Sequence, residues 1–206
     1  MEATKRLLIL GGTFNPIHSG HIKAAVELEK QYHPDGVLFI PTNLPPHKAV
    51  GADFVSGEHR LEMIRRAIQD RPGYQVSDME LRRGGKSYTV DTLTQLRQEY
   101  PGYQLYFVMG TDMLLSFESW REFRKIFSLC TLVAASREKE GRPVLEAEAQ
   151  RLRQQYGAHI QVVDVDPVEV SSTQIRSRLR QGQPVTGWIP GPVEEYIVQQ
   201  GLYREE

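Results

Sequence analysis

Short apolar runs alternate along this chain with longer stretches in which apolar residues recur at every third or fourth position. The short runs are rich in β-branched and aromatic residues, which is typical of strands, and they span residues 6–10, 36–40, 74–79, 103–109, 129–135 and 160–165. The longer stretches predict amphipathic helices at residues 22–32, 58–69, 89–100 and 145–156. Strands that alternate with helices of this length predict an α/β fold with a doubly wound, mostly parallel sheet and helices on both faces.

The length of the chain and the spread of its residue types predict one domain. A chain of 206 residues is long enough to bury a core, and its 17 Gly and 12 Pro are scattered rather than gathered in a linker. We therefore expect a single domain over residues 1–206, with a helical C-terminal part from about residue 166. The last 25 residues are expected to pack against the sheet or a second subunit, which leaves a homo-oligomer open.

Charge and cysteine content narrow the class of protein. The 25 Lys and Arg residues nearly balance the 26 Asp and Glu residues, and a net charge of −1 argues against nucleic-acid binding, which needs a basic face. No stretch approaches the roughly 20 apolar residues of a membrane-spanning helix, so small-molecule partners become the expectation. The single cysteine, Cys130, lies in an apolar run and is expected to be a buried strand residue in the reducing cytoplasm.

The segment after the first predicted strand carries the densest chemical signal. In a doubly wound sheet the ligand lies beyond the carboxyl ends of the strands. There the chain reads GGTFNPIHSGH over residues 11–21 and then enters a helix near Ile22. Gly11 and Gly12 are expected to let the backbone turn tightly near a ligand, while the helix start offers N–H groups to an anion. The segment is neither a dinucleotide fingerprint nor a Walker loop.

Two histidines in this segment predict a phosphate-binding pair. His18 and His21 are three residues apart at the start of a helix, so both can face the same phosphate, and Gly20 between them is expected to leave that face open. One alternative is an ordinary surface or core histidine. Another is a zinc site, which needs three or four ligands, although only His47 and His59 are in plausible reach and no cysteine helps.

A second anion site is predicted near the end of the chain. Ser171, Ser172 and Thr173 form an N-cap cluster that opens a short helix, and Arg176 falls one turn in, beside the N-terminus of that helix. The alternative is a capped helix with a solvated arginine.

Other polar residues lie where the predicted sheet would present them to a ligand. A proline-rich extended loop over residues 41–48 ends in His47 and Lys48, which either face the same phosphates or are simply exposed. Thr89 is a natural helix cap, and Asp112 follows a strand, where it could accept a hydrogen bond from a ribose hydroxyl. Trp120 either packs in the core or stacks on a ligand ring.

The glycine and histidine segments together resemble a known family. GGTFNP at residues 11–16, followed by HSGH at residues 18–21, is similar to the motif of the nucleotidyltransferases that join a nucleotide monophosphate or a phosphate ester to ATP. The Asn15-Pro16 pair resembles the bacterial nicotinate-nucleotide adenylyltransferases more than the phosphopantetheine or cytidylyl branches. Further matches run from residue 6 to about residue 180. The resemblance implies a Rossmann-like fold.

The resemblance also implies which residues meet ATP. The catalytic residues would be His18, His21 and Arg176, with the stretch SSTQIR at residues 171–176 around the β- and γ-phosphates. Mg²⁺ is implied as a cofactor bound mainly through the ATP phosphates, with no ligand from protein side chains. The implied ATP-binding residues are Gly11, Gly12, Thr13, Phe14, His18, Gly20, His21, Ser172, Thr173 and Arg176.

A second group of residues is implied to bind nicotinate mononucleotide. Trp120 matches the aromatic residue that stacks on the pyridine ring in this branch. An aromatic residue often follows that tryptophan, whereas this chain has Arg121. The implied acceptor-binding residues are Asn43, His47, Lys48, Thr89, Asp112, Trp120 and Arg137.

The expected reaction is attack by the phosphate of nicotinate mononucleotide on the α-phosphorus of ATP, which gives nicotinic acid adenine dinucleotide and pyrophosphate. The attacking phosphate is already anionic at neutral pH, so direct in-line transfer needs no general base and no covalent enzyme intermediate. Two alternatives remain: a sister enzyme that uses nicotinamide mononucleotide or phosphopantetheine, and a nucleotide-binding regulator without turnover. The regulator would predict damage to His18, His21 or Arg176, and all three residues are present.

Overall fold

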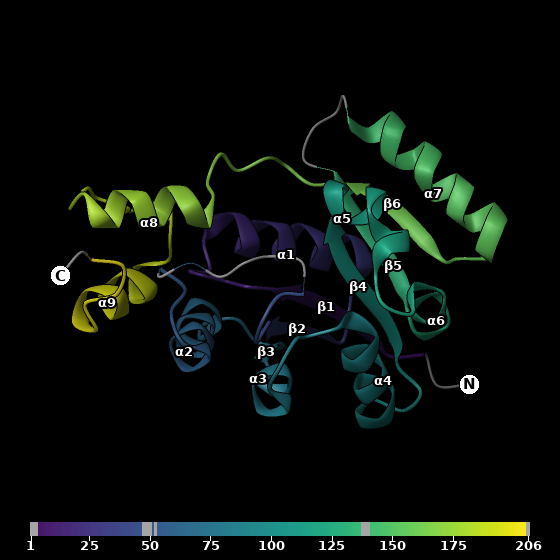
Figure 1. Ribbon diagram of the computed structural model, residues 1–206, viewed down its shortest axis with the longest axis horizontal. Helices are drawn as coiled ribbons and strands as arrows, with labels where there is room; N and C mark the ends of the chain where they lie inside the picture. The colour runs from purple at the N-terminus through teal and green to yellow at the C-terminus, as the bar shows by residue number, and fades with distance from the viewer. Residues whose placement is uncertain (1–3, 47–50, 52, 137–140, 205–206) are drawn as a thin grey trace.

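Six strands form a parallel sheet in the order β3-β2-β1-β4-β5-β6 (Figure 1). The structure is a computed structural model that describes residues 4–46, 51, 53–136 and 141–204. Each neighbouring pair of strands runs parallel, and the order reverses between β1 and β4, which is the doubly wound, Rossmann-like arrangement expected from the sequence. The strands are β1 (Arg6–Gly12), β2 (Gly36–Pro41), β3 (Tyr74–Val76), β4 (Gln104–Gly110), β5 (Thr131–Ser136) and β6 (Ile160–Asp164).

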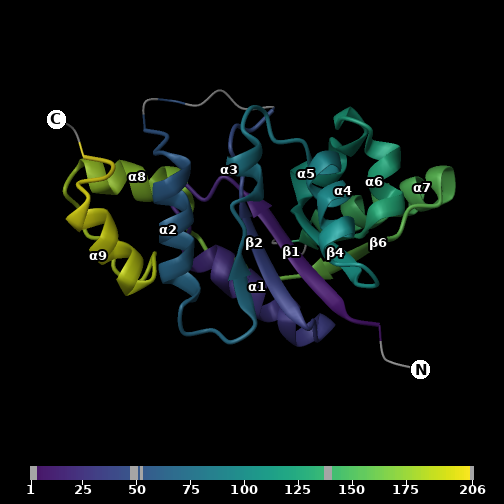
Figure 2. The same ribbon diagram turned by 90° about the horizontal axis from the view of Figure 1, so that it is seen from below.

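Helices cover both faces of the sheet (Figure 2). Alternate side chains of β1 enter opposite cores: Leu8 and Leu10 pack on one face, and Leu7 and Ile9 on the other. The first face carries α1 (Ser19–Tyr32), α2 (Gly57–Ile68), α8 (Ser172–Arg180) and α9 (Gly191–Gln199). The second carries α3 (Met79–Arg83), α4 (Thr89–Glu99), α5 (Thr111–Leu115), α6 (Phe123–Leu129) and α7 (Arg142–Tyr156), with the 3₁₀ turn η1 (Phe117–Ser119) between α5 and α6.

Several predicted boundaries were wrong because an apolar run does not distinguish a strand from a helix end. Residues 123, 126, 127 and 130 follow helical spacing, and they form α6 and its C-cap, so β5 begins only at Thr131. Cys130 is buried as predicted, but it caps α6 instead of lying in a strand. Similarly, Met79 opens α3 and β3 ends at Val76. None of the helices in the described ranges is long and apolar enough to cross a membrane.

The C-terminal segment packs against the start of the molecule. The backbone N–H and the hydroxyl of Ser19 both donate to the carbonyl of Trp188, at 2.9 Å each. The hydroxyl of Tyr203 donates to Oδ1 of Asn15 over 2.8 Å, and both residues are buried. Trp188 and Tyr203 therefore support the loop between β1 and α1 and the start of α1.

We expect Tyr203→Phe to lower the free energy of unfolding by about 1 kcal/mol, the usual contribution of a buried hydrogen bond. The loss stays this small because Asn15 Oδ1 also accepts the backbone N–H of Val55 at 3.3 Å. Denaturant unfolding measures the change, with Tyr103→Phe as a control whose hydroxyl is outside this contact. Equal stabilities of the two variants would contradict the assigned role.

Candidate active site

The loop that leaves β1 turns sharply at Phe14. Phe14 has a φ of +48°, in the left-handed region that non-glycine residues rarely adopt, and the next peptide bond, between Asn15 and Pro16, is cis. Gly11 and Gly12 still belong to β1, so the expectation that they make the turn was wrong. The two glycines instead leave room for neighbouring aromatic rings. A Cβ on Gly12 would lie 3.2 Å from the Phe14 ring, and one on Gly11 would lie 3.4 Å from the Phe107 ring.

The two histidines lie against each other at the N-terminus of α1. The helix begins at Ser19, earlier than predicted, so His18 is its N-cap residue and His21 lies in its first turn. The rings stack with centroids 3.7 Å apart and planes 29° apart. The backbone N–H of His18 donates to Nδ1 of His21 over 3.2 Å, which leaves Nε2 of His21 as the protonated, donating nitrogen.

Gly20 lies so close to the ring of His18 that a side chain at this position would crowd it. A Cβ at this position would lie 3.1 Å from two atoms of the His18 ring and 3.4 Å from Cβ of Val168. Gly20 therefore leaves room for the His18 ring and Val168, and its expected role of keeping the face of the helix open to a phosphate stays a prediction.

The N-terminus of α8 lies beside this loop. Of the three residues predicted as an N-cap cluster, Ser171 is the N-cap residue, and it exchanges hydrogen bonds with Gln174 in a capping box. The hydroxyl of Ser172 donates to the carbonyl of Pro16 over 2.9 Å, although 156 residues separate the two in sequence. The start of α8 is thus joined to the loop between β1 and α1, and Thr173 in the first turn of α8 is exposed.

Arg176 binds two loops, the one after β1 and the one before α2. Its Nε donates to Oδ2 of Asp53 over 2.6 Å, and its Nη1 donates to the carbonyl of Asn15 over 2.8 Å. The hydrogen bond from Arg176 is the main reason that the pKa of Asp53 lies below its usual range, and Arg180, 3.6 Å away, acts in the same direction. Sequence reasoning missed Asp53, because it lies in a loop with no motif around it.

The loop after β2 is tied to the segment before α4. The backbone N–H of Asn43 donates to the hydroxyl of Ser87 over 3.0 Å, and its side-chain amide donates to the carbonyl of Gly85 over 2.9 Å. Thr89 is the first residue of α4 and Tyr88 is its N-cap, so the prediction of Thr89 as the cap was wrong by one residue. His47, Lys48 and Arg137 lie outside the described residues.

Asp112 and Trp120 follow β4, which pairs with the edge of β1 opposite to β2. Asp112 is exposed in the first turn of α5. Trp120 is half-buried, with its ring centroid 5.1 Å from that of Phe117 and 6.5 Å from that of Phe107. The tryptophan is thus partly a core residue, and its exposed part remains available for a ligand. Arg121 lies over the ring of Tyr88, with its guanidinium carbon 4.7 Å from the centroid.

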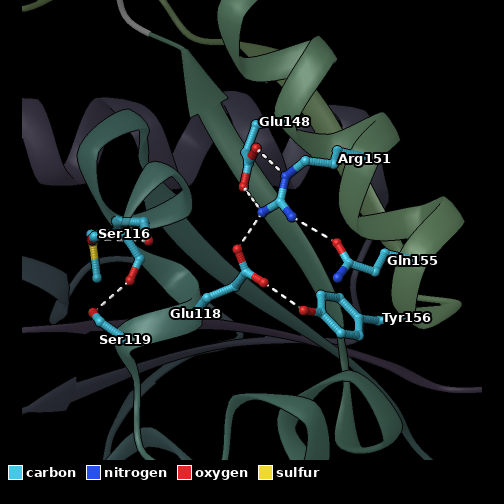
Figure 3. Close-up of polar contacts among 8 residues, drawn as sticks. Ser116, Glu118, Ser119, Glu148, Arg151, Gln155 and Tyr156 are labelled. Atoms are coloured by element: carbon cyan, nitrogen blue, oxygen red, sulfur yellow. Dashed lines mark hydrogen bonds and ion pairs between the residues drawn. The ribbon is translucent and has the colours of Figure 1, made fainter.

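A surface network fastens the turn before Trp120 to α7 (Figure 3). Glu118 of η1 accepts hydrogen bonds from Tyr156 and Arg151, and Arg151 also binds Glu148 and Gln155. The bonds from Tyr156 and Arg151 lower the pKa of Glu118. This network holds η1 at a fixed position relative to α7, and Trp120 is the C-cap residue of η1.

The surface has an open cavity, and the described residues offer no cluster of metal-binding side chains. The cavity, of about 470 Å³, lies beyond the carboxyl ends of β5 and β6 and is lined in part by Ser136, Asp164 and Val165. Within the described parts of the chain, no three His, Cys, Asp or Glu side chains are grouped so that they could hold a metal ion.

Comparison with known proteins identifies the family. The cytidylyltransferase-like family model matches residues 9–178. The probable nicotinate-nucleotide adenylyltransferase of Desulfitobacterium hafniense (strain DSM 10664 / DCB-2) is 41% identical over 200 residues, 97% of this chain and 96% of the relative. The chain belongs to the nicotinate-nucleotide adenylyltransferase family. The probable nicotinate-nucleotide adenylyltransferase of Citrifermentans bemidjiense is 40% identical over 212 residues. The alignment covers 96% of this chain and 98% of that relative. The resemblance noted in the sequence is confirmed.

Solved structures of nicotinate-nucleotide adenylyltransferases share the fold. The Plasmodium falciparum nicotinic acid mononucleotide adenylyltransferase complexed with NaAD has a TM-score of 0.77 at 18% identity, with 97% of each chain covered. A putative nicotinate-nucleotide adenylyltransferase from Vibrio parahaemolyticus has a TM-score of 0.68 at 22% identity, with 98% of this chain and 97% of that chain covered.

The contact between Asp53 and Arg176 predicts a pH-dependent stability. A carboxyl whose pKa is lower in the folded chain stabilises the fold above its ordinary pKa of about 3.9, and this contribution disappears as the pH falls through the folded-state pKa. We expect Asp53→Asn to lower the free energy of unfolding at pH 7 by about 1 kcal/mol, and to differ progressively less from the wild type below about pH 4. Denaturant unfolding at several pH values measures this, with the exposed Asp70→Asn as the control. A difference that does not depend on pH would contradict the assignment.

Proposed function

We propose that this chain transfers the adenylyl group of ATP to nicotinate mononucleotide, giving nicotinic acid adenine dinucleotide and pyrophosphate in NAD biosynthesis. The observation that carries the proposal is the hydrogen bond of Ser172, at the N-terminus of α8, to Pro16 in the loop that leads into α1. His18 and His21 lie at the start of α1, and Arg176 binds the same loop at Asn15. Helix N-termini, imidazoles and a guanidinium are the groups that bind phosphates. The names of the relatives support nicotinate mononucleotide as the acceptor.

The reaction needs positioning and charge stabilisation more than proton transfer. The phosphate of nicotinate mononucleotide carries close to two negative charges at neutral pH, and one of its oxygens forms a bond to the α-phosphorus as the bond to the pyrophosphate oxygen breaks. No general base is required. The chain supplies hydrogen-bond donors for the charge on the phosphate oxygens and a fixed geometry for in-line attack.

We assign ATP to the loop after β1 and to the start of α8. The donating Nε2 of His21 would bind the transferred phosphate, and His18 would fix the orientation of His21 through their stacked rings. The β- and γ-phosphates would meet Arg176, which must share its guanidinium between them and Asp53. The remaining ATP contacts are assigned to Gly11, Gly12, Thr13, Phe14, Gly20, Ser172 and Thr173.

The acceptor is assigned to the loop after β2, the start of α4 and the region after β4. The exposed part of the Trp120 ring would stack on the pyridine, and Asp112 would accept a hydrogen bond from a ribose hydroxyl. The other residues assigned to nicotinate mononucleotide are Asn43, His47, Lys48, Thr89 and Arg137.

Divalent metal use is general among nucleotidyltransferases, and we assign Mg²⁺ to the phosphates of ATP. Asp53 is a carboxylate beside the assigned triphosphate site, but it is already bound by Arg176. This arrangement fits a metal ion whose ligands are phosphate and water oxygens rather than a protein carboxylate. When bound, the ion neutralises part of the phosphate charge. The cytoplasmic location and the homo-oligomer stay predictions.

The direct test is acceptor-dependent release of pyrophosphate from ATP. We expect release with nicotinate mononucleotide, with one dinucleotide formed per pyrophosphate, and much slower release with nicotinamide mononucleotide or phosphopantetheine. Faster turnover of one of the latter two would make the chain a sister enzyme. Binding of ATP without release in the presence of any acceptor would favour the regulator.

We expect His21→Ala to lower kcat by about 10²- to 10³-fold while the KM for ATP changes little, because a donor that strengthens its bond in the transition state contributes mainly to the rate. Steady-state kinetics at saturating acceptor measure both constants. His159→Ala, which removes an exposed imidazole far along the chain, is the matched control. Equal kcat values for His21→Ala and the wild type would exclude the catalytic role.

For Trp120→Ala we expect a rise of roughly fivefold in the KM for nicotinate mononucleotide, since an aromatic stack contributes about 1 kcal/mol. The KM for ATP should stay unchanged. Trp120→Phe, which keeps an aromatic face, should retain most of the acceptor affinity. A change confined to the KM for ATP would count against this assignment.

A further inference from the structure

Arg60 is a buried cation that neither the motifs nor the proposed chemistry uses. It lies in α2, and only 1% of its surface is exposed. Burial lowers the pKa of its guanidinium to about 10, so the side chain is still charged at neutral pH. Burying a charge is costly, and an apolar residue of similar size would usually stabilise a core as well or better. The position therefore calls for a reason other than packing.

The hydrogen-bond partners of Arg60 are all backbone carbonyls. Its Nη1 donates to Thr13 over 2.8 Å and to Thr42 over 2.6 Å, and Nη2 donates to Asn43 over 3.4 Å. Its Nε donates to Val55 over 3.3 Å. The ring of Phe54 lies over the guanidinium, with its centroid 4.5 Å from the central carbon. A planar group with five donors can hold several carbonyls at once in a fixed geometry.

These carbonyls belong to loops at the ends of two neighbouring strands. Thr13 follows β1, in the loop assigned to ATP, and Thr42 and Asn43 follow β2, in the loop assigned to the acceptor. The backbone N–H of Thr42 also donates to the carbonyl of Gly12 over 2.8 Å, which continues the pairing of the strands to this point. Because one nitrogen of Arg60 binds both Thr13 and Thr42, neither loop can shift alone without losing a charge-assisted hydrogen bond.

We propose that Arg60 is a positioning residue that sets the spacing between the ATP loop after β1 and the acceptor loop after β2. This inference rests on the proposed function, because it takes the assignment of the two substrates to the two loops from there. Arg60 touches neither substrate. In-line attack needs reacting atoms about 3–3.5 Å apart, and a misplacement of about 1 Å can lower the rate by about 10²-fold. A residue that fixes the loops therefore acts mainly on kcat.

The kinetic test compares Arg60→Lys and Arg60→Met with the same changes at Arg65. Arg65 lies on the same helix but is exposed and pairs only loosely with Glu62, at 3.8 Å. Lysine keeps the charge on a single nitrogen, which cannot reach all four carbonyls. At a temperature well below every Tm, we expect kcat to fall about 10- to 100-fold in both Arg60 variants, less in Lys than in Met, with the Arg65 variants unchanged. A lower Tm with an unchanged kcat would overturn the proposal, because it would show a purely structural residue.

Amide hydrogen exchange measures how firmly the two loops are held, independently of catalytic turnover. In Arg60→Lys we expect the peptides that cover residues 9–17 and 38–46 to exchange faster together, by about tenfold, while a peptide from β5 keeps the wild-type rate. Acceleration throughout the chain, or in neither loop, would overturn the proposal. If Arg60→Lys does not fold, Phe54→Leu takes its place, since it loosens the guanidinium without removing it, and the same paired response is expected.

The two proposals can fail separately. A wild type that releases no pyrophosphate with any acceptor would refute the proposed function, and the exchange measurement would then still decide whether Arg60 fixes the two loops. An active wild type whose Arg60 variants keep full kcat would refute only the positioning role.

Discussion

The pairing of β1 with β2 on one side and β4 on the other is the constraint on which the candidate site depends. β1 is hydrogen-bonded along both edges, and its central side chains are buried on both faces. Its carboxyl end is therefore held firmly, and the segment that leads to the two histidines at the start of α1 begins from a fixed point. The order of the strands reverses at β1 and β4, which opens the space beyond them where ligands of such sheets bind.

The site concentrates positive potential within a chain that is nearly neutral. The net charge of −1 excludes a broad basic surface, but it does not count helix N-termini or the imidazoles of the site as hydrogen-bond donors. Arg176 is bound by Asp53, and Arg60 is buried among backbone carbonyls. Arg176 can meet phosphates, whereas Arg60 contacts four backbone carbonyls and the ring of Phe54. Two highly anionic substrates thus fit a protein with no excess of basic residues.

Sequence patterns predicted the features that depend on residues close together in the chain. The strands, the long helices, the N-cap at Ser171 and the histidine pair all follow from spacing within a few residues. Asp53 and Arg60 could not be predicted, because their importance comes from contacts with residues distant in sequence, such as Arg176 and Thr13. The short helices α3 and α6 were missed for another reason: their apolar residues run directly into a neighbouring strand signal, and only tertiary packing decides where the helix ends.

The stereochemistry at phosphorus tests the central claim, which is direct transfer between two substrates held on adjacent loops. The wild type is given one diastereomer of adenosine 5′-O-(1-thiotriphosphate), which is chiral at the α-phosphorus, together with nicotinate mononucleotide, and the configuration of the dinucleotide product is determined. A single in-line displacement predicts inversion at the α-phosphorus. Retention would require an intermediate adenylylated enzyme, and it would contradict the account.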